Sequence, residues 1–326
     1  MQIDTTEKME TKKKDKNEAG KHIPIMLTEC MGGLDIKPSD ILVDCTVNRG
    51  GHAKEFIKLL GKDGILVCID LDFEALKEAE ENINQELEKL NISKNLRPKV
   101  FYINNNFSNL DTILKELGIE KVDKIFADFG LSSQELDISG RGFSFMRDEP
   151  LLMTFKTESG ITEDDTTARD IVNFWGEESI ANILFNFADE RYSRRIAKGI
   201  IEARKLKTIN TTFELIEIIK ASTPFAYHKL KTNPATRTFQ ALRMAVNDEI
   251  GAIVKLLNSS FELLKEETGR LVVLTFHSTE DRIVKHTARD LGFKQVNKKA
   301  IIAEREEVKE NVRSRSAKLR IYEKNK

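Results

Sequence analysis

The chain has 326 residues, which favours two domains or one domain with a large insertion. Its 52 Lys and Arg residues are balanced by 53 Asp and Glu residues, so the whole chain is not a polycation and only local basic patches remain for nucleic-acid contact. A hydrophobic content of 40% predicts a buried core, whereas no apolar run approaches the roughly 18 residues that a spanning helix requires.

The N-terminal half alternates strand and helix patterns. Residues 1–21 mix Lys with Asp and Glu and are interpreted as a solvated tail. Continuous apolar runs then predict strands at 41–45, 65–70, 100–103 and 124–128, with helices at about 73–90 and 110–117. Short strands separated by helices are typical of a parallel, doubly wound α/β sheet that is covered on both faces.

The pattern changes after residue 135. Residues 136–238 lack a comparable strand run, and apolar residues at spacings of three and four predict one long helix over 177–207 and another over about 211–221. The α/β pattern resumes with a predicted helix at about 241–267 and strands at 270–276, 300–303 and 317–323. We therefore expect an α/β domain made of 22–135 and 239–326, interrupted by a helical insertion at 136–238.

Three cysteines, without a C-x-x-C pair, argue against a disulfide framework or a zinc site and favour a reducing cytoplasm. No compact set of metal-ligand residues stands out, so no metal site is predicted. The possibility of an ion that bridges protein and RNA stays open.

The loop after the first strand carries the first functional signal. Gly50 and Gly51 permit positive φ and close approach of a ligand to the backbone, and Asn48 readily adopts the left-handed conformation. Asp70 ends the next strand about 20 residues later, where a carboxylate accepts hydrogen bonds from ribose hydroxyls in nucleotide-binding folds. The alternatives are a tight connection without a ligand and a solvated residue at a strand end.

The loop has neither the G-x-G-x-x-G of dinucleotide folds nor a G-x-x-x-x-G-K-[ST] phosphate loop, so S-adenosylmethionine fits better than NAD or ATP. Asp128 ends the fourth strand, at the edge where ligands bind in open α/β sheets. The tripeptide 128–130 reads D-F-G, but no H-R-D loop precedes it, so a kinase is not expected.

Motifs in a fixed order then resemble one family over about residues 22–323. They include R-G-G-H at 49–52, R-G-F-S-F-M-R-D at 141–148, D-E-R-Y-S-R-R-I-A at 189–197, N-P-A-T-R-T-F-Q-A-L-R at 233–243 and F-H-S-T-E-D-R-I-V-K at 276–285. The chain is similar to the bacterial small-subunit rRNA cytosine-N(4) methyltransferases of the RsmH (MraW) type. The resemblance implies a class I S-adenosylmethionine-dependent methyltransferase fold, Rossmann-like, with a helical insertion for substrate recognition.

The same resemblance implies a cofactor site and a substrate. The cofactor-lining positions would be Gly50, Gly51, His52, Asp70, Phe107, Asp128 and Glu135. The substrate would be the exocyclic N(4) amine of a cytidine in 16S rRNA near the decoding centre, within the small ribosomal subunit. Phe107 is expected near the adenine, although its pattern alone favours core packing. The sequence leaves open whether the protein is a monomer or a homodimer.

Candidate residues for chemistry and RNA contact follow from position and type. Asp128 and Ser132 are candidate acceptors for the amine, with a helix N-cap as the alternative for Ser132. The candidates for RNA contact are Arg141, Phe143, Arg237, His277, Arg313 and Arg315. Phe143 or Phe145 would stack on an extruded base, whereas core packing is the alternative for His277. Ser278-x-x-Asp281 predicts a capping box, and the basic run Arg191–Lys198 is interpreted as a solvated helix face.

The chain departs from the family pattern at three places. Asn48 replaces a usual glycine, Glu135 replaces a usual glutamine, and 150–156 reads P-L-L-M-T-F-K where the family has P-L-D-M-R-M-D. These changes leave two alternatives open. One is a non-catalytic RNA-binding or ribosome assembly factor that keeps the fold, and the other is a methyltransferase that acts on a different RNA.

Overall fold

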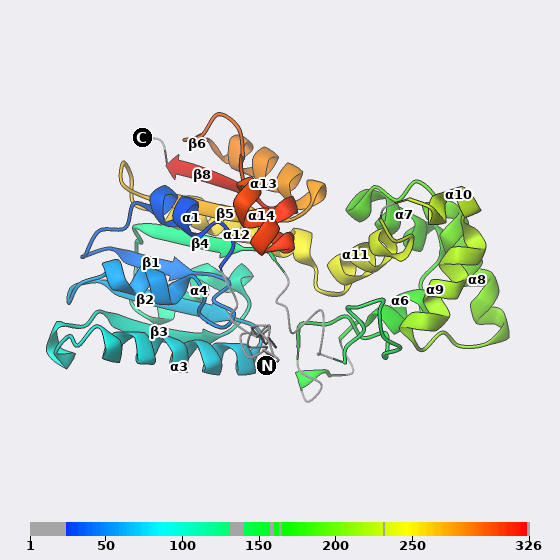
Figure 1. The fold of residues 1–326 in the computed structure, drawn as a ribbon, viewed down its shortest axis with the longest axis horizontal. Helices are drawn as coiled ribbons and strands as arrows, with labels where there is room; N and C mark the ends of the chain where they lie inside the picture. Colours follow the sequence, from blue (N-terminus) through cyan, green and yellow to red (C-terminus); the bar gives the residue numbers. More distant parts are fainter. Residues whose placement is uncertain (1–23, 131–139, 157–159, 163–164, 231, 325–326) are drawn as a thin grey trace, which may run out of the picture.

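A computed structural model describes residues 24–130, 140–156, 160–162, 165–230 and 232–324. It shows an α/β part built on one sheet and a helical part beside it, which meet where α11 is followed by α12 (Figure 1). The predicted fold class, α/β with a helical insertion, is confirmed by this arrangement.

The α/β part contains one sheet in the order β3-β2-β1-β4-β5-β8-β6, with β7 paired to β8. The strands are β1 (Ile41–Asp44), β2 (Ile65–Asp70), β3 (Lys99–Asn104), β4 (Lys124–Asp128), β5 (Arg270–Thr275), β6 (Phe293–Gln295), β7 (Ile301–Ile302) and β8 (Lys318–Lys324). The first five are parallel, whereas β8 runs antiparallel to β5, β6 and β7. The short strand β6 was not predicted, because only Phe293 of its three residues is buried.

Helices cover both faces of this sheet (Figure 1). They are α1 (Leu27–Leu34), α2 (Ala53–Phe56), α3 (Phe73–Lys89), α4 (Leu110–Glu116), α12 (Glu249–Leu263), α13 (Ser278–Leu291) and α14 (Arg305–Glu310). Successive residues of a strand enter different cores: Leu42 packs with α1 and α3, whereas Val43 packs with α4 and α12. Burial on both faces explains why these strands read as continuous apolar runs.

The helical part has its own core. Its helices are α6 (Ala168–Phe174), α7 (Glu177–Ala188), α8 (Ser193–Leu206), α9 (Thr212–Ser222), α10 (Phe225–His228) and α11 (Ala235–Val246). The predicted single helix over 177–207 is wrong, because Asp189 adopts φ 49° and separates α7 from α8. The predicted helix over 241–267 is also divided, at Asp248 with φ 44°.

Helix α11 belongs to the helical part, which shifts the boundary between the two cores. Phe239 and Leu242 lie in the core of the helical part, together with residues of α7 and α8. The boundary between the two cores therefore falls at residues 247–248, rather than at the expected 238–239.

All three cysteines are free and buried. Among the described helices, none combines the length and apolar character needed to cross a membrane.

Candidate active site

The loop after β1 has the left-handed turns that the sequence predicts, with one exception. Asn48 has φ 49° and Gly50 has φ 76°, whereas Gly51 is not among the residues of positive φ. A Cβ on Gly50 would lie 3.3 Å from the Cα of Ala79 in α3. Gly50 is therefore required both for its dihedral angle and for the close approach of this loop to α3, and the loop lies at the carboxyl edge of the sheet.

Asp70 ties the carboxyl end of β2 to this loop. Its Oδ2 accepts a hydrogen bond of 2.7 Å from the backbone N–H of Asn48, and its Oδ1 accepts one of 2.9 Å from Asp72. Asp72 in turn caps α3 by accepting from the N–H groups of Glu74 and Ala75. These bonds fix the Asp70 carboxylate at the place where the sequence predicts a ribose contact.

Asp128 and His52 meet at the same edge. The Asp128 N–H donates to Oγ1 of Thr46 at 2.6 Å, and its Oδ1 accepts from Gly130 N–H at 2.9 Å. Nδ1 of His52 lies 3.9 Å from Oδ2 of Asp128. Because Ile25 O can only accept, Nε2 of His52 carries the proton in their 3.0 Å hydrogen bond. The ring orientation is thereby set, with Nδ1 directed at Asp128.

Phe107 follows β3 and joins this edge through an aromatic contact. Its ring centroid lies 5.7 Å from that of Phe129, the residue after Asp128. It is half-buried, against the core that β4 and α12 share. The sequence-predicted residues Gly50, His52, Asp70, Phe107 and Asp128, together with the loop after β1, thus lie along one edge of the sheet, which we call the rim.

The structure adds Asp44, which the sequence reasoning did not select. Asp44 ends β1 and is 1% exposed, and its Oδ1 accepts from Thr46 N–H at 3.1 Å. Within the described part of the chain, its buried Oδ2 has no hydrogen-bond partner. Burial, with the nearby charges of Asp128 and Asp70, raises the pKa of Asp44 to about 8. A cationic ligand group such as an ammonium would favour the ionised form of Asp44, and its N–H would then satisfy this oxygen.

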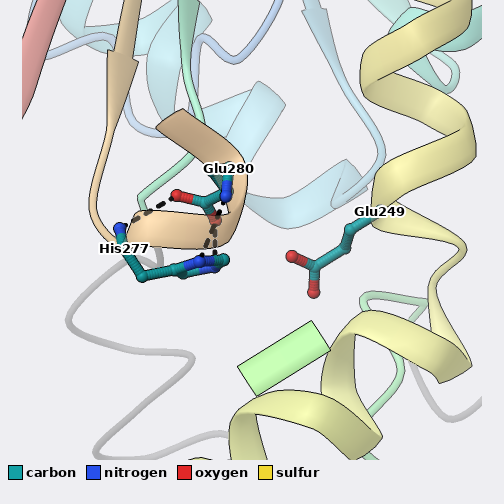
Figure 2. A group of neighbouring side chains, drawn as sticks. All are labelled: Glu249, His277 and Glu280. Carbon is teal, nitrogen blue, oxygen red and sulfur yellow. Dashed lines mark hydrogen bonds and ion pairs between the residues drawn. The ribbon is translucent and has the colours of Figure 1, made fainter. Parts of the chain in front are cut away.

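A second group of titratable side chains lies where β5 leads into α13. Ligand atoms of Glu249, His277 and Glu280 lie within 4.8 Å of one another (Figure 2). The sequence did not predict this group, because Glu249 is far from the other two along the chain. Only the folded structure brings these three residues of metal-ligand type together.

An arginine supplies the positive charge for this group. Arg243 donates from Nε to Oε1 of Glu249 at 2.6 Å and from Nη2 to Oε2 at 2.7 Å, and its Nη2 lies 3.5 Å from Oε1 of Glu280. Both oxygens of Glu249 are committed to the guanidinium, and a bidentate pair of this kind is among the stronger charge-assisted contacts. A metal ion would have to displace Arg243, so we assign no metal to the cluster.

His277 lies three residues beyond Leu274, the β5 partner of Asp128. It forms the N-cap of α13: its side chain accepts from the N–H of Glu280, and its Nε2 lies 2.6 Å from Oε1 of the same residue. The capping box predicted at Ser278 and Asp281 is therefore wrong by one residue. Asp281 instead binds Arg320 and Lys318.

Arg141 has a structural role in place of the predicted RNA contact. It is 6% exposed, and Nη1 donates to the carbonyls of Phe155 and Lys156 at 2.8 and 2.9 Å. Its Nη2 lies 3.6 Å from Oδ2 of Asp72 in the α/β part. Phe143 is likewise buried in the helical core and stacks on Phe155, so its ring is not an open platform for a base.

The altered segment 150–156 is held through its main chain. Arg141 binds the carbonyls of residues 155 and 156, while Asn247 accepts from Phe155 N–H and donates to Met153 O. Leu151 and Met153 are buried in the helical core. The sequence departs from the family pattern at residues 152, 154, 155 and 156. The Thr154 hydroxyl accepts from Lys156 N–H at 3.2 Å, whereas the contacts with Arg141 and Asn247 involve only the main chain of the segment.

The remaining predicted RNA contacts lie apart from one another. Arg237 is exposed on α11 and donates to Asp189 O at 2.6 Å. Arg313 and Arg315 lie in the short 3-10 helix Val312–Ser316 that leads into β8, where Arg315 is exposed. Ser132 and Glu135 lie outside the described residues.

The sheet order, its antiparallel final strand β8 and a rim of Gly50, Asp70 and Asp128 define the class of protein: a class I S-adenosylmethionine-dependent methyltransferase of Rossmann-like fold. Within this class the chain belongs to the MraW methylase family, whose model matches residues 19–325.

Similar proteins support this family assignment over most of the chain. The chain is 36% identical to "Ribosomal RNA small subunit methyltransferase H" of Clostridioides difficile (strain 630), over 93% of this chain and 98% of that protein. It is 40% identical to the protein of the same name from Clostridium botulinum (strain Kyoto / Type A2), over 93% of this chain and 99% of that protein. The relative from Finegoldia magna is 39% identical over 93% of this chain and 98% of that protein.

Proposed function

We propose that this protein transfers a methyl group from S-adenosylmethionine to the exocyclic N(4) amine of a cytidine in 16S rRNA, near the decoding centre of the small ribosomal subunit. The observation that carries the proposal is the match to small-subunit rRNA methyltransferases over 93% of the chain. It is supported by a rim in which the described cofactor residues are linked to one another. We further propose that the protein acts in the cytoplasm.

The rim residues fit the cofactor. The positive φ of Gly50 brings the loop backbone close to α3, and Asp70 offers a fixed carboxylate for hydroxyl donors. Asp44 offers a buried carboxyl oxygen that has no partner among the described residues. Phe107 offers an aromatic face beside Phe129. When bound, the cofactor supplies a methyl group that its sulfonium has already activated.

The protein's part in the reaction is to orient the amine. The lone pair of a cytosine amine is delocalised into the ring, so the amine is a weak nucleophile. We assign Asp128 as the acceptor for an amine N–H, because its carboxylate is fixed by Gly130 and faces Nδ1 of His52. An oriented amine gains from proximity, an effect worth up to roughly 7–11 kcal/mol in favourable cases. Ser132 remains a second candidate acceptor.

The acceptor base has to leave its stack to reach the rim. We propose that His277, at the N-terminus of α13, and Arg237 on α11 contact the RNA near the base, since both belong to elements at the junction of the two parts (Figure 1). Arg313 and Arg315, which precede β8, would contact phosphates.

The alternative is an RNA-binding or assembly factor without turnover. It depends on the departures at 150–156. Main-chain hydrogen bonds to Arg141 and Asn247 hold this segment in place, which favours the enzyme.

The test is incorporation of labelled methyl into small subunits that lack the modification, with the modified nucleotide then mapped. We expect transfer by the wild type, its loss in Asp128→Asn, and full transfer by Asp111→Asn, a matched change at an exposed site on α4. Binding of subunits without transfer would favour the assembly factor. Transfer to another RNA or another atom would contradict the proposed substrate.

A further inference from the structure

An exposed group of cations lies in the first turns of α8 and just before its start. The side chains of Arg191, Arg194, Arg195 and Lys198 are all exposed. No ion pair joins any of them to an acid within the described ranges. We call these four residues the α8 patch.

One lysine on α8 and one on the neighbouring helix α9 are each paired with an acid. Lys205, at the far end of α8, lies 3.2 Å from Glu202, and Lys220 on α9 lies 2.8 Å from Glu217. The chain as a whole is balanced at 52 basic and 53 acidic residues. The α8 patch is therefore a local excess of positive charge, which is the electrostatic footprint expected of a polyanion site.

Two tyrosines hold one cation of the patch in place. The Arg191 guanidinium carbon lies 4.8 Å from the ring centroid of Tyr192 and 5.0 Å from that of Tyr227. The Tyr227 hydroxyl donates to Oε2 of Glu190 at 2.6 Å, and Glu190 is fully buried. This support orients the guanidinium before a ligand arrives, which lowers the entropy lost on binding.

The positive charges at the N-terminus of α8 destabilise this helix. Arg194 and Arg195 lie in the first turn of α8, which contains no acid and no side-chain cap. Cations at a helix N-terminus oppose the macrodipole, typically by about 0.3–1 kcal/mol each. An anionic ligand would offset this unfavourable interaction with the macrodipole. Exposure to solvent alone would not explain why two arginines lie in the first turn.

The patch begins next to the α/β part. Asp189, two residues before Arg191, has its Oδ1 3.7 Å from Nη2 of Arg282 on α13, and its carbonyl accepts from Arg237. Helix α13 starts directly after His277. A chain of guanidinium groups thus leads from the start of α13 across to α8.

We propose that the α8 patch binds phosphates of the RNA whose base enters the rim, so that the helical part holds the strand while the α/β part carries out the transfer. This inference rests on the proposed function and assigns a specific surface to the RNA. It also revises the interpretation of residues 191–198 as a solvated face. Exposed arginines that form no ion pair with the described acids suit phosphate oxygens, which accept bidentate donors. Arg191 and Arg195 are in addition supported by the ring of Tyr192.

The test compares two double variants of the full-length protein. R194Q/R195Q removes two charges from the patch, and K205Q/K220Q removes two charges that are paired elsewhere on α8 and α9. Binding to a small-subunit rRNA fragment is measured by fluorescence anisotropy over a range of salt concentrations, with calorimetry of S-adenosylmethionine binding to report on the rim.

We expect R194Q/R195Q to weaken RNA binding at least about fivefold and to lower the slope of log K against log salt by about 2, since each phosphate contact contributes roughly one unit. K205Q/K220Q should bind the RNA as the wild type does, and both variants should keep the wild-type affinity for S-adenosylmethionine. Equal RNA affinity in both variants would overturn the patch while leaving the proposed function intact. A wild type that transfers methyl to small subunits without binding the fragment would overturn the patch alone, and one that does neither would overturn both. Sedimentation with phosphatidylglycerol vesicles is measured in parallel, and a loss confined to vesicle binding would assign the patch to lipid.

Discussion

Nδ1 of His52 lies 3.9 Å from Oδ2 of Asp128, and the opposite ring nitrogen of His52 donates to the carbonyl of Ile25. His52 comes from the loop after β1 and Asp128 from the end of β4, so this contact joins neighbouring strands at the rim. The imidazole also packs 4.8 Å from the ring centroid of Phe126. We therefore predict that His52, whose ring is held by Ile25 O and Phe126, positions the Asp128 carboxylate by packing beside it.

The change His52→Asn tests this role. The shorter side chain loses both the contact with Ile25 O and the one with Asp128. A buried carbonyl left without its donor costs about 1–3 kcal/mol, so we expect a matching loss of stability and at least about tenfold weaker cofactor binding by calorimetry. His286→Asn, on the exposed side of α13, is the control and should bind as the wild type does. Equal cofactor affinity in the two variants would argue against a positioning role.

Gly130 offers a steric test of the rim. A Cβ at Gly130 would lie 2.7 Å from Cε2 of Phe276 and 3.0 Å from Oδ1 of Asp128, whereas a Cβ at Gly32 in α1 would meet nothing within 4 Å. Gly130→Ala therefore has to shift the ring or the carboxylate, and a shift of this kind costs roughly a hundredfold in rate. Single-turnover methyl transfer should fall by about that factor in Gly130→Ala. Gly32→Ala should keep the wild-type rate and gain slight stability, because alanine favours the helix.

The buried Asp44 predicts a pH dependence of stability. Burial raises its pKa from 3.8 to about 8, so between these values the folded state holds one proton that the unfolded chain has released. Stability contributed by this group is therefore lost as pH rises, with a slope near 1.4 kcal/mol per pH unit. Urea unfolding at about pH 5.5, 6.5 and 7.5 should show a flatter profile for Asp44→Asn than for the wild type. Asp111→Asn, at an exposed site, should reproduce the wild-type slope, and parallel profiles for all three proteins would contradict the prediction.

The strands were predictable because their signal is local. Residues 65–70 form β2 with the predicted bounds, since a strand buried on both faces must be apolar throughout. The break at Asp189 was not predictable from periodicity, because Leu184, Ala188, Tyr192 and Ile196 continue a spacing of four across it. Aspartate adopts the left-handed conformation without the glycine or proline that usually marks a helix end.

Site residues, too, were predictable where their conformation depends on the local sequence and not where it depends on tertiary contacts. Asn48 and Gly50 were predictable from turn chemistry, since their dihedral angles depend on the residue itself. The contacts of Arg141 were not predictable, because its partners, the carbonyls of residues 155 and 156 and the carboxylate of Asp72, are set by tertiary packing. The sequence around an arginine in a loop does not show whether its guanidinium will face RNA or bind buried carbonyls.

The pair between Arg243 and Glu249 predicts a change in metal affinity. In Arg243→Ala, Glu249 and Glu280 lose their shared cation, and breaking a buried ion pair costs about 3–5 kcal/mol. The free energy of unfolding should fall by that order. The carboxylates and the His277 imidazole would then be available to a divalent ion, which the guanidinium excludes in the wild type.

Thermal unfolding with and without Zn²⁺ measures this exchange. Zinc should raise the Tm of Arg243→Ala in a concentration-dependent way, because a ligand that binds only the folded state stabilises it by mass action. It should leave the wild type unchanged, and it should fail to rescue R243A/E249A, which lacks one of the three ligands. If zinc stabilised the wild type as strongly as Arg243→Ala, the guanidinium would not be the cation of this cluster. If it stabilised R243A/E249A equally, the ion would bind elsewhere in the chain.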